Sequence, residues 1–228
     1  MDIGIVILSR FSSNRLPGKA LMEINGKPIL KYILERLEQV VPSNKIIIAT
    51  SSEKSDDAIE VFSKNLGIAC FRGSLDNVAE RFFKAAEAQK WDYAVRINGD
   101  NIFLDTAVLK HMISIADVGQ YDFISNVKER TFPKGMSVEI VRMSFYKSVL
   151  HKIINDKELR EHVTLYLYGL SDTKHYYYMN TLLPESAGLQ MALDTKEDFE
   201  RTTKIINAFE LPHYNYNLVE IFNTWKKL

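Results

Sequence analysis

The sequence is short of cysteine and has no excess of charge of either sign. Its 228 residues contain one cysteine, Cys70, which excludes an intramolecular disulfide and a zinc site built from several cysteines. This usage is typical of a reducing compartment. The 29 Lys and Arg residues are matched by 29 Asp and Glu residues. We therefore predict no nucleic-acid partner, and any bound anion must meet a local cluster of cations.

Long apolar runs and linker-like segments are also missing. No run approaches the roughly 20 residues of a membrane-spanning helix, and residues 1–8 lack the basic segment and cleavage site of a signal peptide. There is no Pro-, Gly- or Ser-rich linker and no repeat. We expect a cytoplasmic protein without a membrane partner, folded as one domain over residues 1–228. Its core would comprise 1–120 and 190–228, around an irregular region of about 121–189.

Short apolar runs alternate with amphipathic segments in the first half of the chain. The runs predict buried strands at residues 3–8, 46–50, 68–71 and 93–97. The amphipathic segments predict helices that begin near Pro28, Ser55, Asp76 and Asp105. This βαβαβαβα order is typical of an α/β fold in which helices cover both faces of a mostly parallel sheet, a three-layer sandwich.

The pattern becomes less regular after Tyr121. We expect strands at 123–126, 138–141, 175–180 and 190–194, and a helix at 144–154. Thr195 can cap a further helix, with Asp198 at its third position. The junction between the strand at 190–194 and this helix puts Asp194 at the carboxyl end of a strand.

The first predicted strand leads into a loop rich in cations and hydroxyl groups. Ligands of open α/β sheets bind at the carboxyl ends of the strands. The loop carries the cations Arg10, Arg15 and Lys19 together with Ser12 and Ser13. Three cations directly after a buried strand form a trap for an anion such as a triphosphate. The alternative is a solvated polar loop, which is the commoner setting of a single Arg or Lys.

Two common nucleotide-binding motifs do not fit this loop. A G-x-G-x-x-G motif needs three glycines, whereas this loop has residues such as Phe11, Ser12 and Asn14 in their place. A Walker loop would need glycine at Ser13 and a hydroxyl residue at Ala20. The second strand also ends without an acidic residue that could hold a ribose 2′-hydroxyl. These mismatches argue against an NAD enzyme and a P-loop protein.

A second polar turn follows the strand at 93–97. It includes Asn98 and Asp100 and would face the first loop. A carboxylate opposite phosphate-binding cations is most simply explained by Mg²⁺, which favours one or two carboxylates together with phosphate and water oxygens. Asp194 is a candidate second ligand. The alternatives are an Asx turn for Asp100 and helix capping for Asp194.

Taken in their order along the chain, these motifs resemble the cytidylyltransferases that make CMP-activated acid sugars. Residues 10–19 are similar to the R-x-x-S-x-R-L-P-G-K signature of that family, and further matching segments are 26–28, 72–74, 98–100 and 193–195. Segments 130–135 and 160–164 resemble the branch typified by a spore-coat polysaccharide protein more than the 3-deoxy-manno-octulosonate enzymes. The sequence departs from that branch at Ser12, Ile102 and Ser137, where Gly, Pro and an acidic residue are usual.

The resemblance implies both a fold and a reaction. The fold is the Rossmann-like sheet of the nucleotide-diphospho-sugar transferases, with a small irregular excursion used for dimerisation. The reaction is Mg²⁺-dependent transfer of CMP from CTP to an acid sugar, with release of pyrophosphate, in the synthesis of surface polysaccharide or glycan. Two alternatives stay open: a sugar or polyol phosphate acceptor that gives a CDP product, and a catalytically silent nucleotide-binding homologue.

The resemblance also implies roles for individual residues. The expected catalytic residues are Arg10, Lys19 and Asp100, and the expected Mg²⁺ ligands are Asp100 and Asp194. The expected nucleotide contacts are Leu8, Arg10, Ser12, Ser13, Arg15, Lys19, Thr50, Arg72, Ser74 and Asn98. The expected acceptor contacts are Arg130, Glu139, Arg160 and His162.

Aromatic and apolar residues of the irregular region predict a homodimer. Residues 176–178 are three tyrosines, and leucines lie nearby at 165, 167, 182 and 183. This is more apolar surface than a small excursion can bury, which favours a two-fold contact between copies. The resemblance points the same way. The alternative is that these residues pack on the sheet of their own monomer.

Overall fold

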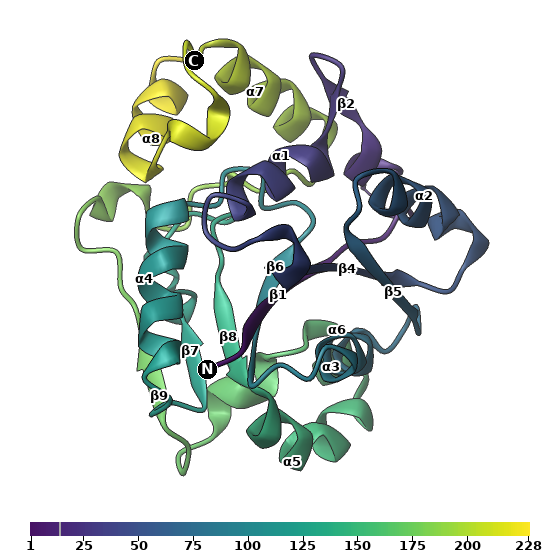
Figure 1. Ribbon diagram of the computed structural model, residues 1–228. Helices are drawn as coiled ribbons and strands as arrows, with labels where there is room; N and C mark the ends of the chain where they lie inside the picture. Colours follow the sequence, from purple (N-terminus) through teal and green to yellow (C-terminus); the bar gives the residue numbers. More distant parts are fainter. Residues whose placement is uncertain (14) are drawn as a thin grey trace.

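A computed structural model describes residues 1–13 and 15–228, and a seven-stranded sheet forms its centre (Figure 1). The strand order is β5-β4-β1-β6-β8-β7-β9. The strands are β1 (Ile3–Leu8), β4 (Ile46–Ser51), β5 (Ala69–Gly73), β6 (Tyr93–Asn98), β7 (Phe123–Ser125), β8 (Glu139–Arg142) and β9 (His175–Tyr177). Strand β8 runs antiparallel to both of its neighbours, whereas the other pairings are parallel. The predicted α/β class and mostly parallel sheet are confirmed.

Helices cover both faces of this sheet. They are α1 (Ile29–Leu37), α2 (Asp57–Asn65), α3 (Val78–Ala88), α4 (Thr106–Asp117), α5 (Met143–Ile154), α6 (Lys157–His162), α7 (Lys196–Asn207) and α8 (Leu218–Lys226). A separate hairpin pairs β2 (Glu23–Ile24) with β3 (Lys27–Pro28). The 3-10 helices are η1 (Lys19–Leu21), η2 (Ser43–Lys45), η3 (Lys54–Asp56), η4 (Lys128–Arg130), η5 (Leu165–Gly169), η6 (Pro184–Ser186) and η7 (His213–Asn215). Within the described residues, no helix is both long and apolar enough to span a bilayer.

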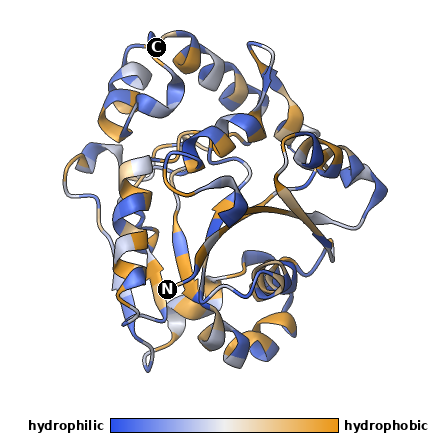
Figure 2. Ribbon diagram, viewed as in Figure 1, coloured by the Kyte–Doolittle hydropathy of each residue, from blue (hydrophilic) through white to orange (hydrophobic). Residues whose placement is uncertain are grey.

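Successive side chains of β1 point to opposite faces of the sheet, and the core therefore has two layers. Ile5 and Ile7 pack toward α1 and α4, whereas Val6 and Leu8 pack toward α3 and α5. Both faces of the strand are therefore apolar, and Figure 2 shows the same orange colour on the central strands. Burial of such side chains stabilises the fold by roughly 1.5–3 kcal/mol each. This explains why the sequence of a buried parallel strand is a continuous apolar run.

Polar caps fix where the helices begin. Asn77 accepts a hydrogen bond from the backbone of Glu80 and starts α3. Thr195 and Asp198 form the predicted capping box of α7. Each cap satisfies backbone N–H groups that have no partner within the helix, and its loss costs about 1 kcal/mol.

The prediction of a strand at 190–194 was wrong. Gln190 forms one isolated bridge with Lys134, and the residues that follow are not paired as a strand. Met191 and Leu193 are buried in the core, and the backbone of the segment lies against Gly135, where an added Cβ would lie 2.5 Å from the backbone nitrogen of Ala192. The apolar run therefore reports burial rather than strand pairing. The strand at 175–180 is also shorter than predicted and ends at Tyr177.

A buried arginine attaches the C-terminal part of the chain to α1. The guanidinium of Arg36 donates to the carbonyl oxygens of Leu104, His213 and Tyr216 at 2.6–3.1 Å. Burial lowers the pKa of Arg36 to about 10, so the side chain stays charged at neutral pH. Next to it, Nε2 of His213 lies 2.8 Å from the Glu35 carboxylate.

Candidate active site

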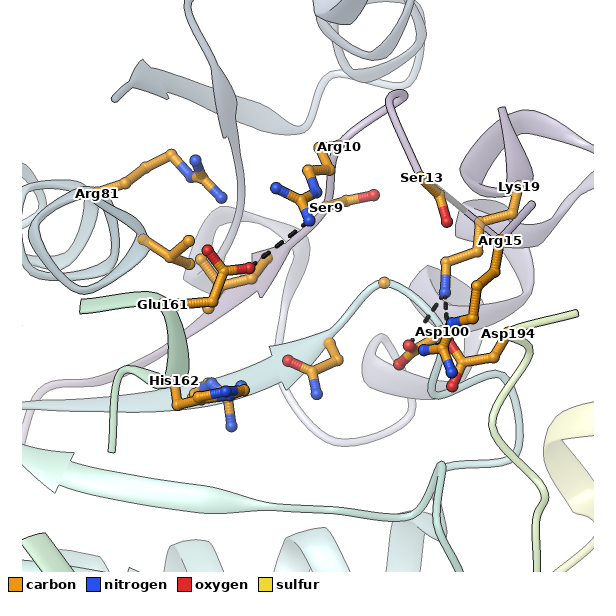
Figure 3. Close-up of a pocket in the computed structure, with 15 residues that line it drawn as sticks. Ser9, Arg10, Ser13, Arg15, Lys19, Arg81, Asp100, Glu161, His162 and Asp194 are labelled. Carbon is orange, nitrogen blue, oxygen red and sulfur yellow. Dashed lines mark hydrogen bonds and ion pairs between the residues drawn. The ribbon is translucent and has the colours of Figure 1, made fainter. Parts of the chain in front are cut away.

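A cavity of about 440 Å³ opens at the carboxyl ends of β1 and β6 (Figure 3). This is the edge of an α/β sheet where ligands are expected. Its walls are formed by Leu8, Ser9, Arg10, Ser13, Arg15, Lys19, Val78, Arg81, Arg96, Asn98, Gly99, Asp100, Glu161, His162 and Asp194. The predicted loop cations and both predicted carboxylates therefore share one cavity.

Lys19 joins the two carboxylates at one end of this cavity. Its Nζ donates to Asp100 Oδ2 at 3.2 Å, to Asp194 Oδ1 at 2.9 Å and to the carbonyl oxygen of Leu193 at 2.8 Å. Nη2 of Arg15 lies 3.0 Å from the same Asp194 oxygen. Two anions and two cations thus meet within hydrogen-bond distance (Figure 3).

The two carboxylates differ in their electrostatic setting. Burial raises the pKa of Asp100 above its ordinary value, and the charge of Asp194 adds to this effect. Burial acts in the same direction on Asp194, but the bonds from Lys19 and the charge of Arg15 outweigh it and hold the pKa of Asp194 below its ordinary value. Asp100 is therefore the carboxylate for which further positive charge would be most stabilising.

A buried carboxylate behind the first loop holds that loop in place. Asp56 accepts hydrogen bonds from the backbone of Phe11 at 2.7 Å, from the hydroxyl of Thr50 at 2.8 Å and from the backbone of Ser51 at 2.8 Å. Burial alone would raise the pKa of Asp56, but these bonds lower it below its ordinary value. Gly18 has φ 73° and donates to the Phe11 carbonyl, which closes the loop.

Several predicted nucleotide contacts lie outside the cavity walls. Thr50 is fully buried, and its hydroxyl donates a hydrogen bond to the Asp56 carboxylate. Arg72 is held by the carboxylates of Asp57 and Glu60, both at 2.6 Å. The Ser74 hydroxyl accepts from the backbone of Asn77, and Ser12 is exposed on the loop. The residues lie near the predicted edge of the sheet, but hydrogen bonds to local partners turn the side chains of Thr50, Arg72 and Ser74 away from the cavity.

The opposite end of the cavity contains residues that the sequence reasoning missed. Arg81 points into the cavity from α3, and Arg10 Nη2 lies 3.6 Å from the Glu161 carboxylate (Figure 3). Burial lowers the pKa of Arg81 to about 10. A signal was present, because Arg81 comes three residues after Val78 on the inward face of the predicted helix. A charged residue on such a face needs a polar partner.

A second cavity, of about 470 Å³, adjoins the first. The two share Arg96, Asn98, Asp100, His162 and Asp194. The irregular region supplies most of its other walls, including Arg130, Lys134, Glu139, Thr164 and Tyr168. The carboxylates Asp100 and Asp194 therefore stand where two ligands could meet.

A buried polar network forms one wall of the second cavity. Glu139 is 3% exposed and accepts hydrogen bonds from the hydroxyls of Thr164 at 2.8 Å and Tyr168 at 2.6 Å. Its other carboxylate oxygen pairs with Arg96, the residue opposite it on β6. Burial raises the pKa of Tyr168, and the negative charge of Glu139 adds to this effect. The network fixes the side chains of Arg96 and Glu139 where the two cavities meet.

A strained turn places His162 on the border between the cavities. Val163, fully buried, has φ 53° and ψ −62°, and the Thr164 N–H bonds the His162 carbonyl across it. This is a γ-turn of the rare sign, which is strained for a β-branched residue. The hydroxyl of Tyr146 donates to the Val163 carbonyl at 2.8 Å, and this bond helps to hold the turn. Strain of this kind costs about 1–3 kcal/mol and collects at functional sites.

Two of the predicted acceptor contacts have different surroundings. Arg130 lines the second cavity, has φ 50° and lies 3.2 Å from the Ser137 hydroxyl. Arg160 lines neither of these cavities but a neighbouring surface hollow, together with Asp76 and His162. Both residues belong to the short helix α6, where residues two apart face different directions, and of the two only His162 also lines the first and second cavities.

The sheet, the cation-rich first loop and the paired carboxylates define the class of protein: it is a nucleotidyltransferase. Residues 4–217 match the sequence profile of the family described as cytidylyltransferase, and the chain belongs to that family. It is 32% identical over 208 residues to the spore coat polysaccharide biosynthesis protein SpsF of Bacillus subtilis, covering 87% of this chain and 84% of SpsF. The predicted family is confirmed.

Solved structures agree with this assignment. A cytidylyltransferase from Leptospira borgpetersenii is similar with a TM-score of 0.91 and 30% identity, covering 100% of this chain and 94% of the other. A CMP:2-keto-3-deoxy-manno-octonic acid synthetase complexed with CTP is similar with a TM-score of 0.66, covering 91% of this chain and 99% of that one. At 15% identity, the latter shows a common fold.

Proposed function

We propose that this enzyme transfers CMP from CTP to a small acid sugar and releases pyrophosphate. The observation that carries the proposal is the position of Asp100 and Asp194, both bonded by Lys19, on the border of two adjoining cavities. Such an arrangement suits a reaction in which the acceptor in one cavity attacks the α-phosphorus of a nucleotide in the other. The family and the likeness to SpsF support CTP as donor and polysaccharide synthesis as the setting.

In this proposal the first loop holds the triphosphate. Arg10, Arg15 and Lys19 donate to the β- and γ-phosphate oxygens, and Ser13 supports the turn between them. No side chain acts as a nucleophile. The rate comes from positioning the acceptor in line with the α-phosphorus and from neutralising charge as pyrophosphate leaves.

Asp100 and Asp194 would hold a divalent cation, which we propose is Mg²⁺. The Lys19 ammonium binds both carboxylates at once, so the gap between them suits a cation. The described residues contain no group of three or more metal-ligating side chains, and two carboxylates are the share that Mg²⁺ takes when phosphates and waters supply the rest. Bound there, the cation would neutralise charge on the α-phosphate.

The second cavity would hold the acceptor. Arg130 and Lys134 bring two cations to a cavity whose walls also contain carboxylates and hydroxyls, a combination suited to a sugar that carries a carboxylate. Glu139 is committed to Arg96, Thr164 and Tyr168, so in this proposal it positions those side chains.

Pyrophosphate release tests the proposal. The purified chain is incubated with CTP and Mg²⁺ and with a panel of acid sugars and sugar phosphates, 3-deoxy-manno-octulosonate included. We expect release that depends on one acid sugar and stops on addition of EDTA. Release that depends on a sugar phosphate would favour a CDP product, and preference for a purine triphosphate would reject the proposal.

We also propose a homodimer that forms through the irregular region. Strand β9 is one of the two outer strands of the sheet, and Leu182, five residues after its end, is 78% exposed. The three predicted tyrosines are half-buried and contact their own monomer, as in the stacking of Tyr177 on Tyr168. The tyrosines are thus partly buried within the monomer itself. The proposal therefore rests on the outer edge of β9 and on the exposed Leu182.

A further inference from the structure

Among residues 1–13 and 15–228, Arg96 is the only lysine or arginine that lines both cavities. The cations of the first loop line the first cavity, whereas Arg130 and Lys134 line the second. Asp100 and Asp194 also line both. Arg96 therefore shares the border between the cavities with the two proposed metal ligands.

One nitrogen of the Arg96 guanidinium is left for a ligand. Nη1 pairs with the carboxylate of Glu139, which lies opposite Arg96 on β8. Nε is fully buried, so nothing in the cavities can reach it. Within the part of the chain that the structure describes, Nη2 forms no hydrogen bond and is not one of the fully buried nitrogens. The side chain is 16% exposed, and Nη2 is the nitrogen that a ligand in the cavities can contact.

Arg96 is held in one orientation before any ligand enters. Its counter-charge, Glu139, is 3% exposed and is bonded on its other oxygen by the hydroxyls of Thr164 and Tyr168. The pairing of β6 with β8 fixes both backbones. Arg130, by contrast, is an exposed side chain. A cation that is already fixed loses less conformational freedom when it binds an anion, which favours Arg96 as the anchor of a charged group.

The position of Arg96 restricts which acceptor it suits. In the proposed reaction the attacking oxygen approaches to about 3–3.5 Å from the α-phosphorus, which lies beside Asp100 and Asp194. A carboxylate bound by Arg96 at the same border is close to that oxygen. An acid sugar meets this condition when its carboxylate and its attacking hydroxyl are joined to one carbon. In a uronic acid the two groups stand at opposite ends of the ring, so the carboxylate would lie away from the border.

We propose that Arg96 selects an acceptor of the first kind by donating from Nη2 to its carboxylate. This inference rests on the proposed transfer of CMP to an acid sugar, and it adds which residue binds the carboxylate and where on the sugar the carboxylate stands. Arg96 would then lie between two carboxylates, with Nη1 on Glu139 and Nη2 on the acceptor. The forked donors of a guanidinium allow this arrangement, whereas a lysine ammonium is a single point charge.

A comparison of an acid with its own amide tests this role. The probes are 3-deoxy-manno-octulosonate and N-acetylneuraminate, which carry carboxylate and hydroxyl on one carbon, their C1 carboxamides, and glucuronate. Pyrophosphate release from CTP gives kcat/KM for each. We expect wild type to prefer acid over amide by about tenfold to a hundredfold and to leave glucuronate unused. In Arg96→Lys, which keeps a charge beside Glu139, the ratio of acid to amide should fall close to one.

A second variant and a matched control separate this role from a structural one. Arg96→Gln combined with Glu139→Gln removes both charges of the pair, so no buried carboxylate is left unpaired, and it should also lose the ratio. The control Arg142→Lys changes another arginine of β8, which pairs with Asp122 and is outside the described walls of both cavities. It should keep the ratio. Calorimetry should give wild-type CTP affinity for all three variants.

A wild-type ratio of acid to amide in both Arg96 variants would overturn the inference. So would use of glucuronate in preference to the other acids, or a loss of CTP affinity in Arg96→Lys as large as the loss of acceptor kcat/KM, because Arg96 would then act on the nucleotide or on the fold. Wild type that releases no pyrophosphate with any acid sugar would instead refute the proposed function itself.

Discussion

Lys19 and Asp194 are 175 positions apart in the sequence, yet Nζ of Lys19 lies 2.9 Å from the Asp194 carboxylate. A backbone bond brings Asp194 to this place, because the N–H of Leu193 donates to the carbonyl oxygen of Asp100 at 3.2 Å. The segment that precedes α7 is thereby tied to the turn that follows β6. The loop after β1, the turn after β6 and this late segment meet at one ammonium group.

Asp100→Asn should remove turnover while the protein stays folded. We expect kcat to fall at least about a hundredfold, since the carboxylate is needed to neutralise phosphate charge. The melting temperature should stay the same or rise, because burial and Asp194 already disfavour the charge on Asp100. Rate and melting temperature are measured together, with Asp172→Asn as an exposed control. Normal turnover in the folded variant would contradict the catalytic role.

Arg15→Ala should weaken CTP much more than CMP. The Arg15 side chain is 67% exposed, so its loss leaves the fold intact, and its proposed partners are the β- and γ-phosphates. A charged contact of this kind contributes about 1.5–3 kcal/mol, or roughly tenfold to a hundredfold in affinity. Calorimetry with both nucleotides measures the difference, and Lys54→Ala serves as a surface control. Equal weakening of CTP and CMP would show that Arg15 only shapes the loop.

Glu139→Gln should affect both stability and the acceptor. The substitution leaves the half-buried Arg96 guanidinium without its buried counter-charge, which lowers the free energy of unfolding by about 3 kcal/mol. The acceptor KM should rise while CTP affinity stays near wild type, because the network borders the second cavity. Urea unfolding and steady-state kinetics check these effects against exposed Glu185→Gln. An unchanged acceptor KM would leave Glu139 with a structural role alone.

His213 should make the protein less stable as the pH falls from about 6.5 to about 4. Burial lowers the pKa of His213 from 6.5 to about 4, against the opposing effect of Glu35. In this window the unfolded chain binds a proton that the folded protein does not, so stability is fully present above pH 6.5 and is lost toward pH 4 by up to about 3 kcal/mol.

Urea unfolding at a series of pH values measures this loss. His213→Gln should flatten the profile between pH 6.5 and 4, whereas exposed His151→Gln should leave it as in wild type. A His213→Gln profile as steep as that of wild type would assign the acid sensitivity to other groups.

Light scattering at micromolar concentration checks the proposed dimer. We expect twice the 26.2 kDa mass of the chain, and a return to that mass in Leu182→Asp. Leu182 is the informative position because it is 78% exposed and its change leaves the monomer core untouched. A wild-type mass of 26.2 kDa would reject the dimer.

The sequence predicted the parallel half of the fold because its signals are local. Buried parallel strands such as β1 and β6 are continuous apolar runs, and polar residues that follow them must gather at one edge of the sheet. This rule predicted that Asp100 lies beside the first loop. Asp194 lies at the same site although the strand expected at 190–194 does not form, because the backbone bond from Leu193 to Asp100 holds the segment there.

The remainder of the site depends on contacts that no local pattern encodes. Arg96 faces Glu139 only because β8 pairs antiparallel with β6, a pairing between segments 43 residues apart. Thr50 and Arg72 have residue types that suit a nucleotide site, but Asp56 and the carboxylates of α2 bind them. Arg81 was detectable as a charge on an apolar helix face, although its partners, the carbonyl oxygens of Ser74 and Leu75, are visible only in the structure.

The fate of the α-phosphate of CTP is the most direct measure of the central claim. The enzyme is supplied with CTP labelled at the α-phosphorus, a divalent cation and the panel of acid sugars, and the products are separated. We predict that the label moves to an acid sugar as its CMP derivative, in equal amount to the pyrophosphate released, and that Asp100→Asn forms neither. Label that stays in CTP or appears only as free CMP with every acid sugar offered, or that moves only when it is supplied in a purine triphosphate, would contradict it.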